Sequence, residues 1–160
     1  MAASASTTPT ATIHTYLYHF TKVTGDKPAV TDFPANAEKV IDIKSYPDLG
    51  GDPEKIDVTT LSDSVQRNIN GVQQMDTMQF TANYTKGDKR KLDTLEKKGE
   101  AEWYAVVFGA DSSDAPDGHD GIVFWQGGVS SYVSGGDVNA AREITIVIST
   151  ATAPELMADA

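Results

Sequence analysis

Two segments of this chain show a strict alternation of side-chain character, and that pattern most constrains the fold. Within the segment Met75–Tyr84, from Thr77 onward, apolar residues at every second position alternate with Thr, Gln and Asn. Between Arg142 and Ser149, three isoleucines alternate with Thr145 and Val147. Successive side chains of a β-strand point to opposite faces. Both segments are therefore predicted to be strands with one face turned to a dry core.

Other segments rich in aromatic and β-branched residues extend this pattern. Further strands are predicted at Ile13–Val23, Glu38–Lys44, Ile56–Leu61, Glu102–Phe108, Ile122–Gln126 and Val129–Val133. With only one convincing helix, the sum is about seven to eight strands. We expect a mainly β fold, a β-sandwich or partly closed barrel with one flanking α-helix.

That helix is predicted over Asp88–Lys98, with Asp88 as the N-cap and Gly99 just past its end. Its apolar stripe is narrow, because only Leu92 and Leu95 recur at helical spacing. We therefore expect a surface helix that packs along one edge.

The remaining segments are read as connections and ends. Ser45–Lys55 contains two prolines and two glycines and is predicted to be a long loop without regular structure. Residues 1–12 are expected to form a flexible N-terminal arm without signal-peptide character, and 150–160 a C-terminal tail. Residues 13–149 would then form a single domain, since 160 residues suit one core.

The chain is acidic, with 23 Asp and Glu against 13 Lys and Arg, a net charge of −10. This balance argues against nucleic-acid affinity, which depends on cations that displace counterions from phosphates. No apolar run approaches the roughly 20 residues that span a bilayer, so no membrane role is expected.

Catalytic motifs are missing from the sequence. There is no cysteine, no nucleophile elbow and no phosphate-binding glycine loop. The three histidines, His14, His19 and His119, do not form a metal-binding motif and are read as ordinary strand or loop residues. We expect neither enzymatic activity nor a cofactor.

A loop after the Glu102–Phe108 strand carries four aspartates spaced by three, Asp111, Asp114, Asp117 and Asp120. Carboxylate oxygens suit a hard cation such as calcium. The spacing differs from the EF-hand loop, however, and Asp, Ser, Pro and Gly also form turns for local reasons. A solvated hairpin is the preferred interpretation, with a calcium site as the alternative.

The predicted helix region concentrates positive charge, since six of the 13 basic residues lie between Lys86 and Lys98. One interpretation is a solvated helix face. The other is a positive patch that meets a negative patch on a neighbouring copy of the chain.

Two motifs resemble those of a known family. One reads Ile-Asp-Val-Thr-Thr-Leu-Ser-Asp at Ile56–Asp63, followed by Gly71, the Met78–Tyr84 strand and the helix. The other reads Phe-Trp-Gln-Gly-Gly-Val-Ser-Ser-Tyr at Phe124–Tyr132, followed by a Gly-Gly turn and the closing strand. Their order over residues 35–150 resembles the major tail protein, or tail tube protein, of phages with long non-contractile tails.

The resemblance implies a β-sandwich-like tube module with one helix and a place in the phage tail of the virion. It further implies hexameric rings that stack into a hollow tube through which DNA passes without specific binding. The partners implied are further copies of the chain, a tape-measure protein, a tail terminator and a distal tail protein. Loops and terminal arms would make the contacts between rings.

The candidate self-assembly contacts therefore fall in the loop and on the helix. They are Tyr46, Pro47, Leu49, Gly50, Lys89, Arg90, Lys97 and Lys98.

Two alternatives remain at this stage. A ligand-binding sandwich of the carbohydrate type would use Trp103 or Trp125 as a stacking platform. Another ring-forming tail protein, such as a terminator or connector, would assemble without forming tubes.

Overall fold

The computed structural model describes residues 13–33, 35–73, 77–99 and 101–158, so the N-terminal arm expected at 1–12 lies outside the described residues. The described part contains eleven strands, one α-helix and one short 3-10 helix, which confirms the expected mainly β fold with a single α-helix. In chain order the elements are β1 (Thr15–Phe20), η1 (Val30–Asp32), β2 (Ala37–Ile41), β3 (Ile43–Ser45), β4 (Pro53–Asp57), β5 (Asn68–Gln73), β6 (Met78–Asn83), α1 (Lys86–Lys97), β7 (Glu102–Ala110), β8 (Pro116–Gly127), β9 (Val129–Val133), β10 (Glu143–Ile148) and β11 (Glu155–Leu156).

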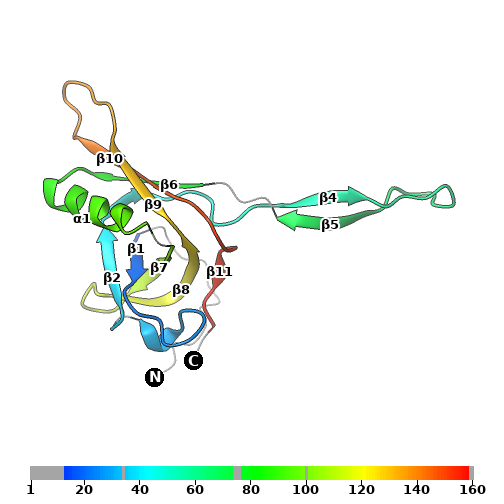
Figure 1. Cartoon of the computed structure of the whole chain (residues 1–160), viewed down its shortest axis with the longest axis horizontal. Coiled ribbons are helices and arrows are strands. Elements are labelled where there is room, and N and C mark those ends of the chain that lie inside the picture. The colour runs from blue at the N-terminus through cyan, green and yellow to red at the C-terminus, as the bar shows by residue number, and fades with distance from the viewer. Residues whose placement is uncertain (1–12, 34, 74–76, 100, 159–160) are drawn as a thin grey trace.

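The strands form three antiparallel sheets (Figure 1). A five-stranded sheet has the order β11-β8-β7-β1-β2, and a four-stranded sheet has the order β3-β6-β10-β9. These two sheets enclose the main core as a sandwich that is not closed into a barrel. The third sheet is the β4–β5 hairpin, which projects from the body as a long arm (Figure 1).

The register of β6 and β10 explains the alternation in their sequences. Ile146 lies opposite Phe80, and the flanking pairs place Ile144 and Ile148 opposite Ala82 and Met78. All six of these apolar side chains are at most 3% exposed. Both strands therefore turn one continuous apolar face to the core, as the period of two predicts.

The centre of the five-stranded sheet, at β7, is buried on both faces. In β7, Tyr104 and Val106 enter the main core, while Ala105 and Val107 face a second apolar cluster. The chain around η1 and the buried Met157 contribute to that second cluster. Because both faces are dry, β7 reads as a continuous apolar run instead of an alternating one.

The helix α1 begins one turn earlier than the sequence predicted. Its N-cap is Thr85, whose Oγ1 accepts a hydrogen bond from the Asp88 backbone N–H at 3.2 Å. The prediction of Asp88 as N-cap is wrong, because this aspartate lies in the first turn and its carboxylate accepts from the Thr85 hydroxyl. Gly99 has a φ of 65°, which agrees with its predicted place just past the helix.

The single strand predicted over Glu38–Lys44 is two strands. β2 belongs to the five-stranded sheet and β3 to the four-stranded sheet, so the chain changes sheets at Asp42. The apolar alternation continues across this change, which is why the pattern gave no sign of it.

The prediction that Ser45–Lys55 holds no regular structure is wrong at both ends. β3 includes Ser45, and β4 begins at Pro53, a position where an edge strand tolerates proline. Strand β5, which pairs with β4, was not predicted. In the segment expected to be a C-terminal tail, β11 pairs with β8 through Glu155 and Leu156.

Candidate assembly surfaces

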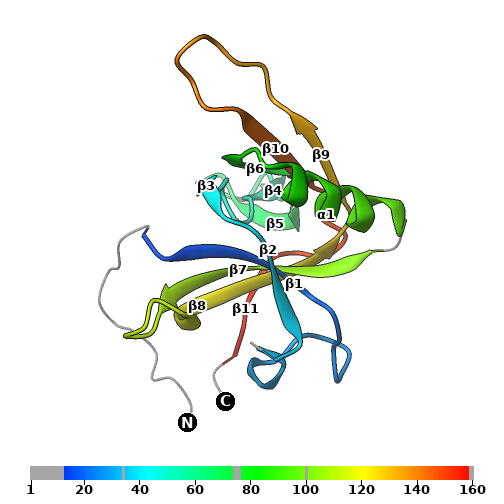
Figure 2. The same cartoon turned by 90° about the vertical axis from the view of Figure 1, so that its left-hand side faces the viewer.

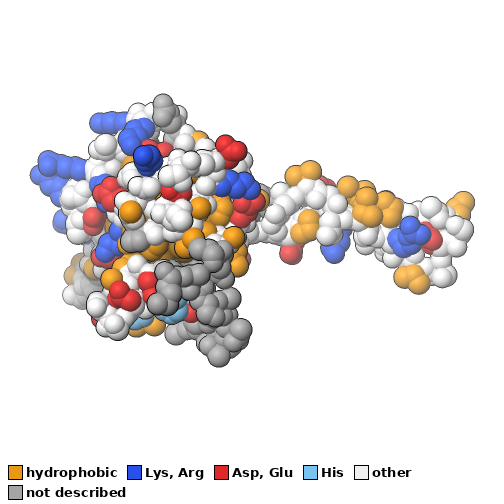
Figure 3. Space-filling view, turned by 90° about the horizontal axis from the view of Figure 1, so that it is seen from below, with side chains coloured by type: hydrophobic (Ala, Val, Ile, Leu, Met, Phe, Trp, Pro, Cys, Tyr) orange, Lys and Arg blue, Asp and Glu red, His pale blue; other side chains and the backbone are white. Residues whose placement is uncertain are grey.

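The β4–β5 arm exposes an unusual amount of apolar surface. Its strands pair Ile56 with Ile69 and Lys55 with Asn70. A two-stranded hairpin has no core of its own and is only marginally stable in water. Five large apolar side chains on the arm are nonetheless 48–108% exposed, and they appear as orange patches along it in Figure 3: Ile56, Leu61, Val65, Ile69 and Val72.

Polar side chains fold the tip of the arm. Asp63 Oδ2 accepts hydrogen bonds from the Thr60 backbone N–H at 2.8 Å and from its hydroxyl at 3.1 Å. The Arg67 guanidinium lies 3.3 Å from the other Asp63 oxygen, and its backbone N–H donates to Thr59 Oγ1 at 2.8 Å. These bonds use the polar residues of the Ile56–Asp63 motif and leave Leu61 fully in solvent.

Gly71 shapes one face of the arm. A Cβ at this position would lie 3.0 Å from the Ile56 side chain and 3.2 Å from the Glu54 carbonyl oxygen. The glycine therefore allows Ile56 to lie across β5, next to Ile69. The packing of Ile56 thus explains why a glycine occurs at this position after the Ile56–Asp63 motif.

The four-stranded sheet offers two edges and one uncharged face. In the described part of the chain, β3 and β9 are its outer strands, so each has a side without a strand partner. The side chains that alternate with the core residues of β6, β9 and β10 carry no charge at its centre: Gln79, Thr81, Ser130, Tyr132, Thr145 and Val147. At the end of the face, Lys44 pairs with Glu143.

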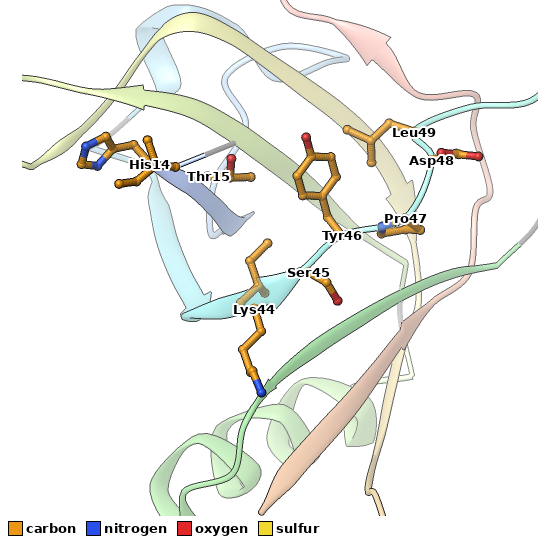
Figure 4. Close-up of a pocket in the computed structure, with 10 residues that line it drawn as sticks. His14, Thr15, Lys44, Ser45, Tyr46, Pro47, Asp48 and Leu49 are labelled. Atoms are coloured by element: carbon orange, nitrogen blue, oxygen red, sulfur yellow. The ribbon is translucent and has the colours of Figure 1, made fainter. Parts of the chain in front are cut away.

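The predicted loop contacts lie at the root of the arm, beside a cavity of about 810 Å³ (Figure 4). Tyr46, Pro47 and Leu49 line this cavity together with His14, which directly precedes β1. The Tyr46 ring packs edge-on against Phe108 at 5.8 Å, so part of its surface already belongs to the subunit core. Gly50 is exposed, with a φ of 131°.

The four predicted helix contacts divide into two pairs. Lys89 binds Asp93 at 2.6 Å and the Ser131 carbonyl oxygen at 3.2 Å, and Lys98 binds Glu102 at 3.0 Å. Both are therefore engaged within the subunit. Arg90 and Lys97 are exposed and have no ion pair among the described residues. Only this second pair remains available to a partner.

The four aspartates belong to the β7–β8 hairpin. Asp111 Oδ1 accepts from the backbone N–H groups of Ser113 and Ala115 at 2.8 and 3.0 Å and so builds the turn. Asp114 lies 4.0 Å from the His14 ring.

Asp117 and Asp120 both contact His119, at 2.7 and 3.3 Å. The hydrogen bond to Asp117 raises the pKa of His119. Within the described ranges, no group of three or more His, Asp and Glu side chains is placed to hold a metal ion.

His19 is buried between two carboxylates, Glu38 at 3.5 Å and Glu102 at 3.6 Å. Burial lowers the pKa of His19, although both carboxylates act in the opposite direction. Lys91 and Lys98 of the helix region bind the same carboxylates, at 2.8 and 3.0 Å. These ion pairs connect the helix to the five-stranded sheet, so we assign the cluster a structural role.

Trp125 does not form the stacking platform that a carbohydrate module would need. Trp125 is completely buried and stacks on Phe80 in the main core, with ring centroids 6.2 Å apart. Trp103 is half-buried against Phe124. The expectation that Trp125 could bind a sugar is wrong, because its strand turns it inward.

The match to a known family agrees with these surfaces. A family model of phage tail tube proteins (TTP) matches residues 12–159. This chain belongs to the phage tail tube protein family. The resemblance seen in the sequence is thereby confirmed, and the tail tube protein is a structural protein of the phage tail, not an enzyme.

Solved tail structures share the fold of this tail tube protein. A chain from the tail of an empty gene transfer agent (GTA) particle, obtained by helical refinement with C6 symmetry, has a TM-score of 0.61 at 16% identity, covering 94% of this chain and 100% of that one. A chain from the virion of a native GTA particle has a TM-score of 0.58 at 14% identity, covering 94% and 100%. A chain from the six-fold-symmetrised anti-feeding prophage baseplate has a TM-score of 0.54 at 10% identity, covering 97% and 96%.

At these identities the similarity establishes the fold alone. No curated protein sequence matches this chain. Its only α-helix in the described ranges has 12 residues, and none there is long and apolar enough to cross a membrane.

Sequence reasoning missed the arm. It identified the Ile56–Asp63 motif but not β5, and so it did not find Val65, Ile69 or Val72. The available signal was the pair of extended segments on either side of a Thr-Thr-Leu-Ser-Asp turn.

Proposed function

We propose that this tail tube protein is the repeating subunit of a phage tail tube, in which six copies form a ring and rings stack into a channel for DNA. The exposed apolar surface of the arm is the main observation that supports this proposal. Its five exposed apolar side chains belong to neither core cluster of the described residues, and burying them against another copy is the direct way to stabilise the hairpin. An arm that reaches beyond its own subunit connects one ring with the next.

The four-stranded sheet supports closure of the ring. Exposed strand edges tend to pair with other chains, and a head-to-tail contact closes into a ring when its rotation permits. Pairing of β3 in one copy with β9 in the next would use both edges of the sheet. The sixfold symmetry of the GTA tail and of the prophage baseplate supports six copies in each ring.

The uncharged face of that sheet suits the wall of a channel. A ring closed through β3 and β9 would join these faces into one continuous surface, and such a surface could line the channel. Gln, Thr and Ser side chains offer no row of cations to hold phosphates, and the net charge of −10 also disfavours binding. DNA would therefore pass without specific binding. A tape-measure protein inside the tube, a terminator above it and a distal tail protein below it complete the proposed assembly.

Electron microscopy of the concentrated, purified full chain tests the function. Tubes with sixfold cross-sections are expected. Compact monomers at every concentration and salt would refute the proposal. Closed rings that never stack would instead favour a terminator-like role.

A further inference from the structure

The outward face of α1 carries a stripe of cations that the subunit does not use. Lys86, Arg90 and Lys97 are exposed and have no ion pair among the described residues. At 3.6 residues per turn these positions fall within about 40° of one another around the helix axis. We call them the basic stripe.

The stripe lies on the side of α1 away from the core. Leu92 and Leu95, which are 0% and 7% exposed, occupy the opposite side of the helix. Asp93 falls within the same face but is neutralised by Lys89 at 2.6 Å. Glu96 is also exposed, but it lies about 80–120° from the stripe around the helix axis. The face along the stripe is therefore positive, in a chain whose net charge is −10.

The complementary surface lies at the root of the arm. Four acids occur within ten positions there, Asp48, Asp52, Glu54 and Asp57, against a single base, Lys55. All four acids are exposed, and none has an ion pair among the described residues. We call these four residues the acidic root. Glu54 alternates along β4 with Lys55 and so shares a face with Ile56.

The two surfaces lie on different sides of the body. In Figure 1, α1 is at one end of the long axis, and the acidic root lies where the arm leaves the other side of the body. Figure 2, seen from the helix end, places α1 in front and β4 and β5 behind it. Complementary patches on different sides of the body do not face each other within one subunit, but they can meet between copies related head to tail.

We propose that the basic stripe is the docking surface for the acidic root of a second copy of this chain. This inference rests on the proposed tube and assigns the contact that orients one subunit on the next. Opposite potentials steer encounter and penalise wrong registers, since like charges then face each other. The exposed apolar side chains of the arm supply burial, and the charged pair selects where the arm lies.

Charge exchange tests this contact. Arg90→Glu with Lys97→Glu is expected to raise the concentration at which tubes form by about tenfold or more, because it places acids against the acidic root. Asp52→Lys with Glu54→Lys is expected to do the same from the other side. Asp57 is left unchanged because its carboxylate accepts from the Thr59 backbone N–H in the arm.

Restoration is the decisive result. A 1:1 mixture of the two double variants presents a Glu stripe to a Lys root and a Lys/Arg stripe to an acidic root, so mixed tubes are expected. One chain with all four changes should also polymerise. The control, Lys22→Glu with Lys27→Glu, makes the same change in net charge at exposed cations between β1 and η1, with Lys27 next to Glu155 of β11, and should leave the tube-forming concentration unchanged.

The outcomes separate the two proposals. If the unaltered chain forms no tubes, the proposed function fails. If it forms tubes and the Arg90→Glu, Lys97→Glu variant forms them at the same concentration, only the docking contact is refuted. A variant that assembles normally but loses binding to duplex DNA would assign the stripe to nucleic acid and overturn this inference.

Discussion

Replacing Leu61 by serine tests whether the tip of the arm is an assembly contact. The Leu61 side chain is fully exposed in the subunit, and its neighbours in the tip hold their hydrogen bonds without it. Exposed substitutions of this kind change the free energy of unfolding by less than about 0.5 kcal/mol. The isolated subunit should therefore keep its thermal unfolding midpoint.

Assembly should respond very differently. Burying a leucine side chain contributes about 1.5–3 kcal/mol. Because about 1.4 kcal/mol corresponds to a factor of ten in an equilibrium constant, Leu61→Ser should raise the critical concentration about 10- to 100-fold. Pelleting of tubes over a concentration series, with the supernatant concentration as readout, measures this quantity directly.

Leu156→Ser provides the matched control. Leu156 is also strongly exposed, at 71%, but it lies in β11 and not on the arm. Its replacement should leave the critical concentration unchanged. The reasoning is refuted if Leu61→Ser and Leu156→Ser have the same effect, or if Leu61→Ser lowers the unfolding midpoint enough to account for lost assembly.

Three further predictions concern the subunit. Thr85→Ala removes the N-cap oxygen of α1 and should lower the free energy of unfolding by about 1 kcal/mol, as measured by urea denaturation. Gly127→Ala should cost about 3 kcal/mol, because a Cβ there would lie 1.7 Å from the Ser149 carbonyl oxygen, whereas Gly128→Ala meets only an ordinary contact and should cost much less; equal losses would contradict this. Burial lowers the pKa of His19 in the folded chain below its ordinary value of 6.5. Between the lowered pKa and 6.5 the unfolded chain therefore binds more protons than the folded chain, and the free energy of unfolding should rise as the pH increases over this range. His19→Gln should remove this part of the pH dependence in urea titrations, and an unchanged pH profile would contradict it.

The parts of the fold that could be predicted are those where a core dictates the pattern. β9 was predicted with its observed bounds, and the cores of β6 and β10 follow from their alternation. β6 and β10 each have one dry face, so every second residue in them is apolar. The helix was found for a similar reason, since Leu92 and Leu95 pack inward.

The arm could not be predicted in this way because it has no dry face within the subunit. In β5, Ile69 and Val72 lie on opposite faces, separated by Asn70 and Gly71, so no single face is apolar. Asparagine and glycine are also depleted in strands. The partner that would give this pattern a reason lies outside the chain.

The candidate contacts on the helix show a different limit. The composition located the basic cluster, but it could not show which of its cations form ion pairs within the subunit. The structure separates them through residues far away in the sequence: Ser131 binds Lys89, and Glu38 binds Lys91. Which cations remain available is thus a property of the tertiary fold.

An arm with exposed isoleucines, leucine and valines would make most subunits aggregate, and the charge distribution offers a reason why this one need not. Copies that each carry a net charge of −10 repel one another at long range. At contact distance the repulsion gives way only where opposite charges meet, and the basic stripe is the part of the helix surface that provides such a meeting with the acidic root. The apolar side chains are then buried in one geometry and remain solvated in the others. The net negative charge and the exposed arm therefore act together. The charge keeps subunits dispersed until the acidic root of one copy meets the basic stripe of another.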